Sequence, residues 1–277
     1  MCEECLAHRL AVCSWSLQPA DPADLIGQLQ QIGMNKIQLG LDPLRADEKW
    51  ADAPRLLNEA GIEVVSGMFG CEGEDYSTLD AIKRTGGIVP DQTWDTNWAN
   101  IQATVPIARS LGLKLMTFHA GFLPEEPSDP SYDKLVDRLT RIADVFADAG
   151  IDLAFETGQE DAPTLKGFLD RLGKGNIGVN FDPANMILYA KGDPVESVRV
   201  LSGYLKSVHI KDATLTETPG EWGAEVVVGT GEVDWPAFFA ALSECDFGGY
   251  LSIEREAGDD RVGDIKLARD FVLKTLA

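Results

Sequence analysis

The chain alternates short apolar runs with amphipathic segments, and this alternation constrains its fold more than any other feature. Eight apolar runs recur, at residues 10–15, 36–40, 62–69, 113–119, 151–156, 176–182, 205–210 and 249–254. Helical patterns lie between them and after the last, at residues 22–32, 98–111, 132–149, 164–172, 194–201, 235–243 and 264–276. Strands that alternate with helices in this way predict βαβ units and a parallel sheet.

Signals at the ends of these segments support the assignment. Asp21 before Pro22 is an acidic N-cap with proline at the first helical position. Gly61 and Gly150 follow predicted helices as C-caps, and each precedes an Ile that opens a strand. Eight strand–helix units predict an α/β fold, a (β/α)8 TIM barrel, which typically has about 250 residues. An open doubly wound sheet is the alternative, but no strand is followed by a G-x-G-x-x-G or Walker-type loop.

We expect a single TIM-barrel domain over residues 1–277, in which residues 1–8 form a loose N-terminal tail. The two widest gaps between strands follow the third and the seventh. The segments 71–95 and 213–228 in these gaps are therefore predicted to be long loops that wall or cover the site.

Acidic residues strongly outnumber basic ones, with 45 Asp and Glu against 24 Lys and Arg, so the net charge is −21. This balance excludes sequence-independent nucleic-acid binding as a main activity and disfavours anionic membranes. No apolar run reaches the roughly 18 to 20 residues of a membrane span. The first ten residues lack the pattern of a secretory leader. We expect a cytoplasmic protein that acts on a small molecule, and homo-oligomerisation stays open.

The five cysteines do not form the pattern of a disulfide framework, which fits a reducing compartment. Cys2 and Cys5 form a C-x-x-C pair, with His8 and Cys13 after it. As zinc ligands they would crowd into one short tail. A redox pair would normally open a helix after a strand, whereas this pair precedes the first strand. We interpret them as incidental thiols.

Side-chain parity along the later strands gives the clearest functional signal. Large apolar residues alternate with polar ones, as at Val208 and Ile210 against Ser207 and His209. In a barrel the apolar set faces the helices and the other set faces the interior. Five consecutive strands therefore place one ionisable group inward at the carboxyl end, where barrel active sites lie. These groups are His119, Glu156, Asp182, His209 and Glu254.

Carboxylates that converge in a confined space repel one another and are costly to desolvate. A divalent cation removes this conflict. Glu156, Asp182, His209 and Glu254 offer mostly oxygen ligands with one imidazole, which suits Mn²⁺ best, with Mg²⁺, Co²⁺ or Zn²⁺ also possible.

Each residue also has a simpler explanation. Asp182 before Pro183 is a common turn or helix-cap sequence, and a single strand histidine is usually a hydrogen-bonded core residue. Four ligand-type residues of the same parity on four successive strands are harder to obtain by chance. Their coincidence favours a metal site.

The sequence resembles the sugar phosphate isomerase/epimerase superfamily, the xylose isomerase-like TIM barrels, over essentially the whole chain. The resemblance lies in the strand-end segments AFETGQE, VNFDPANMILY, VHIKDA and LSIERE. By similarity to the ketose 3-epimerases of that group, Glu156, Asp182, His209 and Glu254 would bind the metal. Glu156 and Glu254 would also be the catalytic proton-transfer groups, and His119 would contact substrate.

Two positions depart from the epimerase pattern. Asn185 stands where those enzymes commonly have a sugar-contacting histidine, and the neighbourhood of Lys211 lacks their arginine. We predict that His119, Asn185 and Lys211 bind substrate or orient a ligand. Three histidines in total exclude the histidine-rich trinuclear zinc site of endonuclease IV, which shares the barrel.

Three functions remain open. The first is a metal-dependent sugar isomerase or epimerase that abstracts a proton beside a carbonyl and passes through a stabilised enediolate. The second is a lyase or dehydratase acting on a keto-inositol or 3-keto-glycoside. The third is a non-catalytic sugar-binding barrel. With no visible phosphate cradle, an unphosphorylated sugar or polyol is preferred as substrate. Aromatic residues near strand ends could wall the sugar, namely Trp15, Phe69, Trp94 and Trp222.

Overall fold

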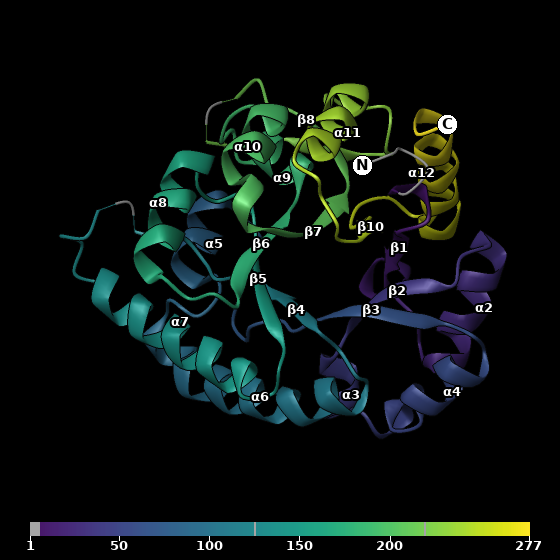
Figure 1. Cartoon of the computed structure of the whole chain (residues 1–277), viewed down its shortest axis with the longest axis horizontal. Coiled ribbons are helices and arrows are strands. Elements are labelled where there is room, and N and C mark those ends of the chain that lie inside the picture. Colours follow the sequence, from purple (N-terminus) through teal and green to yellow (C-terminus); the bar gives the residue numbers. More distant parts are fainter. Residues whose placement is uncertain (1–5, 125, 219) are drawn as a thin grey trace.

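The computed structural model describes residues 6–124, 126–218 and 220–277 and shows a closed barrel of eight parallel strands in the order β1-β10-β7-β6-β5-β4-β3-β2. The first strand pairs with the last, with Leu10 beside Leu251 and Val12 beside Ile253, and this pairing closes the barrel. Figure 1 shows the helices as an outer layer around the strands. The strands are β1 Leu10–Cys13, β2 Lys36–Gly40, β3 Glu63–Met68, β4 Leu115–Phe118, β5 Asp152–Glu156, β6 Ile177–Phe181, β7 Leu205–Ile210 and β10 Leu251–Ile253. All eight lie in the predicted runs.

The helices that cover the barrel include each predicted one. They are α2 Pro22–Ile32, α6 Asp91–Ser110, α7 Tyr132–Ala147, α8 Ala162–Leu172, α10 Pro194–Leu201, α11 Trp235–Glu244 and α12 Arg261–Thr275. The helix expected before Gly61 is α4 Ala53–Glu59, and three short helices of the described residues were not predicted, namely α3 Asp42–Ala46, α5 Leu79–Thr85 and α9 Pro183–Leu188. Short 3₁₀ turns are η1 Ser14–Leu17, η2 Glu48–Trp50 and η3 Ser202–Tyr204. Aspartate side chains cap the N-termini of several helices, and a proline commonly follows the aspartate.

The two strand faces have the predicted parity. Phe181 of β6 points outward and packs against Phe238 of α11, with ring centroids 5.8 Å apart. The alternate residues point inward, because Asn180 of β6 and Gln38 of β2 both meet His209 of β7 inside the barrel at 3.0 Å. Inward residues at the carboxyl ends of the strands are therefore gathered at one mouth of the barrel.

The two segments predicted as long loops contain regular structure. Segment 71–95 includes α5 and the start of α6, and segment 213–228 includes most of an antiparallel hairpin of β8 Asp212–Thr214 and β9 Ala224–Val226. The hairpin is held by Asp212, whose buried carboxylate accepts hydrogen bonds from the backbone of Gly229 and Gly231 and from the Trp235 indole. These segments are therefore fixed walls with secondary structure of their own.

The N-terminal prediction is only partly covered by the described residues. Residues 1–5, with Cys2 and Cys5 of the C-x-x-C pair, lie outside them. Leu6 is fully buried in the core, so this residue of the expected tail packs against the barrel. None of the helices in the described part of the chain is both long enough and apolar enough to cross a bilayer.

Candidate metal centre and active-site cavity

The four predicted metal ligands meet at the carboxyl end of the barrel. Each of Glu156, Asp182, His209 and Glu254 offers one ligand atom, and these atoms all lie within 4.8 Å of one another. His209 is central, because its Nδ1 lies 3.4 Å from Glu156 Oε1, 3.7 Å from Asp182 Oδ2 and 3.3 Å from Glu254 Oε2. All four residues are buried.

A polar network inside the barrel fixes the orientation of His209. Its Nε2 lies 3.0 Å from Gln38 Oε1, while Gln38 Nε2 donates to Thr117 Oγ1 at 2.7 Å. Asn180, held by Ser207 at 2.5 Å, contacts the same imidazole nitrogen. When Nε2 carries the proton and donates it to Gln38, the lone pair of Nδ1 faces the three carboxylates. A partner of this kind on the far nitrogen is typical of metal-binding histidines.

Three buried atoms of this cluster lack a hydrogen-bond partner among the described residues, namely His209 Nδ1, Asp182 Oδ2 and Glu156 Oε2. The first two lie 3.7 Å apart at the centre of the cluster, where a metal would bind, whereas Glu156 Oε2 lies on the side of His119. Buried polar atoms without partners are rare and costly. Three carboxylate groups and one imidazole are ligands that Mn²⁺, Mg²⁺, Co²⁺ and Zn²⁺ accept. The residues present therefore fit a divalent cation.

Glu156, at the end of β5, is positioned from two sides. Asn185 Nδ2 donates to Oε1 at 2.9 Å, and His119 Nε2 lies 3.4 Å from Oε2. Burial raises the pKa of Glu156, but the imidazoles of His119 and His209 outweigh burial and hold this pKa below its usual value. Burial lowers the pKa of His119, whereas the Glu156 carboxylate raises it, with a net increase. Glu156 is thus an ionised carboxylate with one open oxygen.

Glu254, after β10, has both oxygens engaged. The Trp15 indole donates to Oε1 at 2.7 Å, and Lys211 Nζ donates to Oε2 at 2.9 Å. Burial opposes ionisation, but His209 and Lys211 hold the pKa of Glu254 well below its usual value. Lys211 also binds Glu256 Oε2 at 2.6 Å, so the buried ammonium group lies between two carboxylates.

Asp182 serves two purposes at the start of α9. Its Oδ1 accepts the backbone N–H of Asn185 at 3.0 Å and caps the helix, which leaves Oδ2 facing the cluster. Burial raises the pKa of Asp182, and Lys211, 3.8 Å away, offsets only part of this effect. The sequence offered a helix cap and a metal ligand as alternatives, and the geometry is compatible with both at once.

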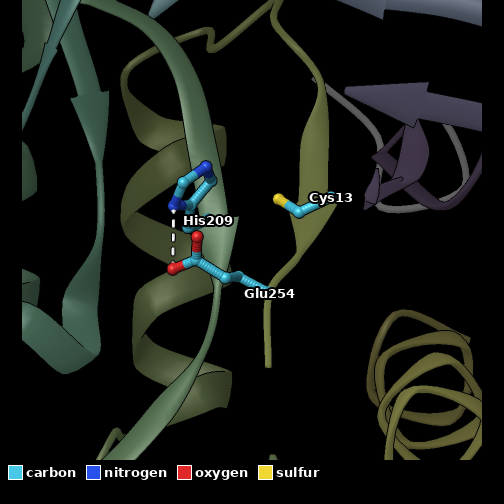
Figure 2. Close-up of side chains that lie close together, drawn as sticks. All are labelled: Cys13, His209 and Glu254. Atoms are coloured by element: carbon cyan, nitrogen blue, oxygen red, sulfur yellow. Dashed lines mark ion pairs between the residues drawn. The ribbon is translucent and has the colours of Figure 1, made fainter. Parts of the chain in front are cut away.

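Cys13 forms a second candidate group with His209 and Glu254, whose potential ligand atoms all lie within 4.8 Å of one another. Figure 2 shows its thiol across from the ion pair between His209 and Glu254. Its Sγ, 3.5 Å from Gln38 Oε1, is fully buried, and burial raises the pKa of this thiol to about 12. A neutral thiol is a poor metal ligand, because the thiolate is the binding form.

A cavity of about 740 Å³ opens above the ligand cluster. Its lining includes partners of the ligands, namely Trp15, His119, Asn185 and Lys211. Both predicted wall segments contribute, through Glu74 and Tyr76 in one and Trp222 and Glu225 in the other. Of the aromatic residues expected to wall a sugar, Phe69 and Trp94 lie in the core instead, because their rings pack among other buried side chains.

Comparison with known proteins identifies the family of this barrel. The family model described as "Xylose isomerase-like TIM barrel" matches residues 26–275. The chain belongs to the xylose isomerase-like TIM barrel family. A xylose isomerase domain protein from Planctomyces limnophilus is 34% identical, with a TM-score of 0.83 and 90% of each chain covered. Inosose dehydratase from Geobacillus kaustophilus is 25% identical over 74% of this chain and 72% of its own length. An L-ribulose 3-epimerase structure shares the fold, with a TM-score of 0.73 at 19% identity over 97% and 94% of the two chains.

Within this xylose isomerase-like barrel, the structure adds residues that sequence reasoning did not assign to the site. Gln38 and Asn180 orient His209, and both are inward by the parity rule that identified the ligands. The Trp15 indole bonds Glu254, whereas the sequence suggested only an apolar wall. The exposed carboxylate of Glu256 accepts a hydrogen bond from Lys211.

Proposed function

We propose that the protein is a divalent-metal-dependent sugar isomerase or epimerase that acts on a neutral keto-sugar or related polyol. The observation that carries the proposal is the pair of ionised carboxylates, Glu156 and Glu254. They lie 3.4 Å and 3.3 Å from His209 Nδ1, beneath a cavity large enough for a sugar. A metal held by Glu156, Asp182, His209 and Glu254, with Mn²⁺ as the preferred ion, would stabilise negative charge on a substrate carbonyl oxygen.

The roles of the side chains follow from their partners. Glu156 takes the proton from the carbon beside the carbonyl, because its Oε2 accepts no hydrogen bond from the described residues and its pKa is held below the usual value. Asn185 holds the other oxygen of Glu156, and His119 stands close enough to orient it or bind a substrate hydroxyl. Returning a proton to the opposite face of that carbon requires a protonated Glu254, and the Lys211 ammonium group that donates to its Oε2 would supply this proton. The Trp15 indole holds the other oxygen of Glu254.

Dehydration is a second candidate because of one feature, the Lys211 ammonium group in the cavity lining. After Glu156 removes the proton, a hydroxyl on the next carbon could leave as water with a proton from this ammonium. The similarity to inosose dehydratase points the same way. Both reactions begin with the same proton abstraction, so the product distinguishes them.

Proton exchange in D₂O, followed by NMR, tests the proposal. Metal-loaded protein is incubated with ketoses, keto-inositols and 3-keto-glycosides, and the metal is stripped before spectra are taken. We expect deuterium at one carbon beside the carbonyl, with exchange lost in Glu156→Gln. The control is Glu63→Gln, an exposed strand glutamate at the opposite end of the barrel. An epimer or an isomer supports the first function, and an unsaturated product supports dehydration. Stoichiometric metal without exchange would favour a sugar-binding barrel.

We also propose a cellular compartment for the protein. Cys13, Cys71 and Cys245 are free thiols in the structure, which fits a cytoplasmic enzyme in a reducing compartment.

A further inference from the structure

The cavity is larger than a single sugar ring requires. Pockets of roughly 300–1,000 Å³ hold drug-sized ligands, and a free hexose is much smaller than these. The cavity of about 740 Å³ lies in the upper part of that range. A hexose bound at the ligand cluster would therefore leave the outer part of the cavity unfilled.

The cavity as a whole is walled by aromatic side chains, of which Trp15 lies at the ligand cluster through its hydrogen bond to Glu254. Trp15, Trp50, Tyr76, Tyr189 and Trp222 line the cavity, and they come from the connections after five different strands. Aromatic rings supply a large apolar contact area with defined geometry. Converging rings from separate connections indicate a surface that accepts another ring.

Tyr189 and Trp222 form the best-defined part of this wall. Their rings meet edge-to-face with centroids 4.8 Å apart. The hairpin of β8 and β9 packs on α9, so the two residues come from elements in direct contact. Trp222 Nε1 is buried and has no hydrogen-bond partner among the described residues. An indole N–H of this kind normally finds an acceptor, and a substrate oxygen in the cavity could supply one.

The charged groups of the lining are already paired with the protein. Glu256 binds Lys211 at 2.6 Å, Glu225 binds Arg255 at 2.8 Å, and Asp42 binds Arg45 at 2.9 Å. A charged substituent would have to compete with these pairs, and the net charge of −21 further disfavours an anion. The outer cavity therefore suits a neutral group.

We propose that the substrate is a neutral keto-sugar that carries a second ring, and that this ring lies against Trp222 and Tyr189. The inference rests on the proposed function for the reacting sugar. The second ring would be an aromatic aglycone or another sugar, since both present an apolar face to an aromatic wall.

Binding of unreactive glycosides to the metal-loaded protein tests the inference by calorimetry. The probes are methyl β-D-glucopyranoside, phenyl β-D-glucopyranoside and cellobiose. We expect phenyl glucoside or cellobiose to bind at least about tenfold more tightly than methyl glucoside. Whichever of phenyl glucoside and cellobiose binds more tightly shows whether the second ring is an aromatic aglycone or another sugar. Trp222→Ala should abolish the preference for the two-ring probes over methyl glucoside, whereas Trp222→Phe should retain part of this preference.

Leu215→Ala, an exposed residue of the same segment, is the matched control, and thermal melting of each variant checks its folding. Equal affinity for the three probes, a ring preference that survives in Trp222→Ala, or no measurable binding of the two-ring probes would overturn the inference. Proton exchange separates the two proposals. If the protein prefers two-ring probes but exchanges no proton on any keto-sugar, the proposed subsite is supported and the proposed reaction is refuted. If it exchanges a proton but shows no preference for two-ring probes, the reaction is supported and the subsite is refuted.

Discussion

Replacing Asp182 with asparagine separates its possible metal-binding role from its role in the fold. The Oδ1 atom caps α9 through the backbone N–H of Asn185, and Oδ2 faces the cluster without a partner among the described residues. Asparagine is as good an N-cap as aspartate, so Asp182→Asn keeps the helix start. It removes one negative charge and one carboxylate oxygen from the metal site.

The expected magnitude follows from metal linkage. Loss of an outer-shell partner typically costs a metal site about 10- to 100-fold in affinity, so loss of a ligand should cost at least ~100-fold. A 100-fold change in affinity corresponds to about 2.7 kcal/mol of metal-induced stabilisation. For a chain of this size, each kcal/mol moves the Tm by about 2–4 °C. The rise in Tm on adding Mn²⁺ should therefore be about 5–10 °C smaller in Asp182→Asn than in the unmodified protein.

The matched control is Asp193→Asn. Asp193 caps α10 with the same geometry, accepting the backbone N–H of Glu196 at 2.9 Å, and is likewise followed by proline, but it takes no part in the ligand cluster. Differential scanning calorimetry with and without Mn²⁺ makes the comparison. Burial raises the pKa of Asp182, so metal-free Asp182→Asn should be at least as stable as the unmodified protein. Equal metal-induced shifts in the two variants would refute the assignment of Asp182 as a ligand.

Three further outcomes are expected. Burial lowers the pKa of His209, but Glu254 and Glu156 raise it well above its usual value, so metal must displace a proton. Metal affinity should therefore rise with pH up to the pKa of His209 in the folded protein. Calorimetry in buffers of different ionisation enthalpy should detect the released proton, and a metal affinity that does not change with pH would contradict this prediction. Trp15→Phe removes the 2.7 Å hydrogen bond to Glu254 and should weaken Mn²⁺ binding by about tenfold in direct titration, whereas unchanged affinity would assign Trp15 to substrate contact alone. Lys211→Met removes a cation beside the site, so metal should bind at least as tightly while turnover falls; weaker metal binding would give Lys211 a purely structural role.

The sequence predicted the barrel because its strands are local features. Each strand was visible as an apolar run, and each proposed ligand was visible as the polar residue of correct parity at the strand end. Asn180 and Gln38 obey the same rule. Their contact with His209 depends on barrel closure, which brings positions 38 and 209 within 3.0 Å.

The parts that sequence reasoning missed depend on tertiary contacts. The indole of Trp15 reaches Glu254 across 239 positions of sequence, and no local pattern distinguishes a bonded indole from an apolar wall. The short helices α3, α5 and α9 have at most seven residues, too few for a clear helical period, whereas α4, with seven residues, was expected because Gly61 marks its end. Asp182 before Pro183 did contain the capping signal for α9, but the sequence alone left it as a turn or a ligand.

The charge of the buried cluster explains why one lysine stands among the proposed ligands. Glu156, Asp182 and Glu254 bring three negative charges into a site from which water is largely excluded. Lys211 supplies one positive charge, which it shares with Glu256, and a divalent cation with neutral His209 would supply two more against the three ligand carboxylates. Without metal, a proton on His209 replaces only one of those charges, which leaves the cluster negative and the site attractive to a cation. A monovalent ion would leave the same deficit. The arrangement therefore selects a divalent ion by charge, and the oxygen-rich ligands then favour ions such as Mn²⁺ and Mg²⁺.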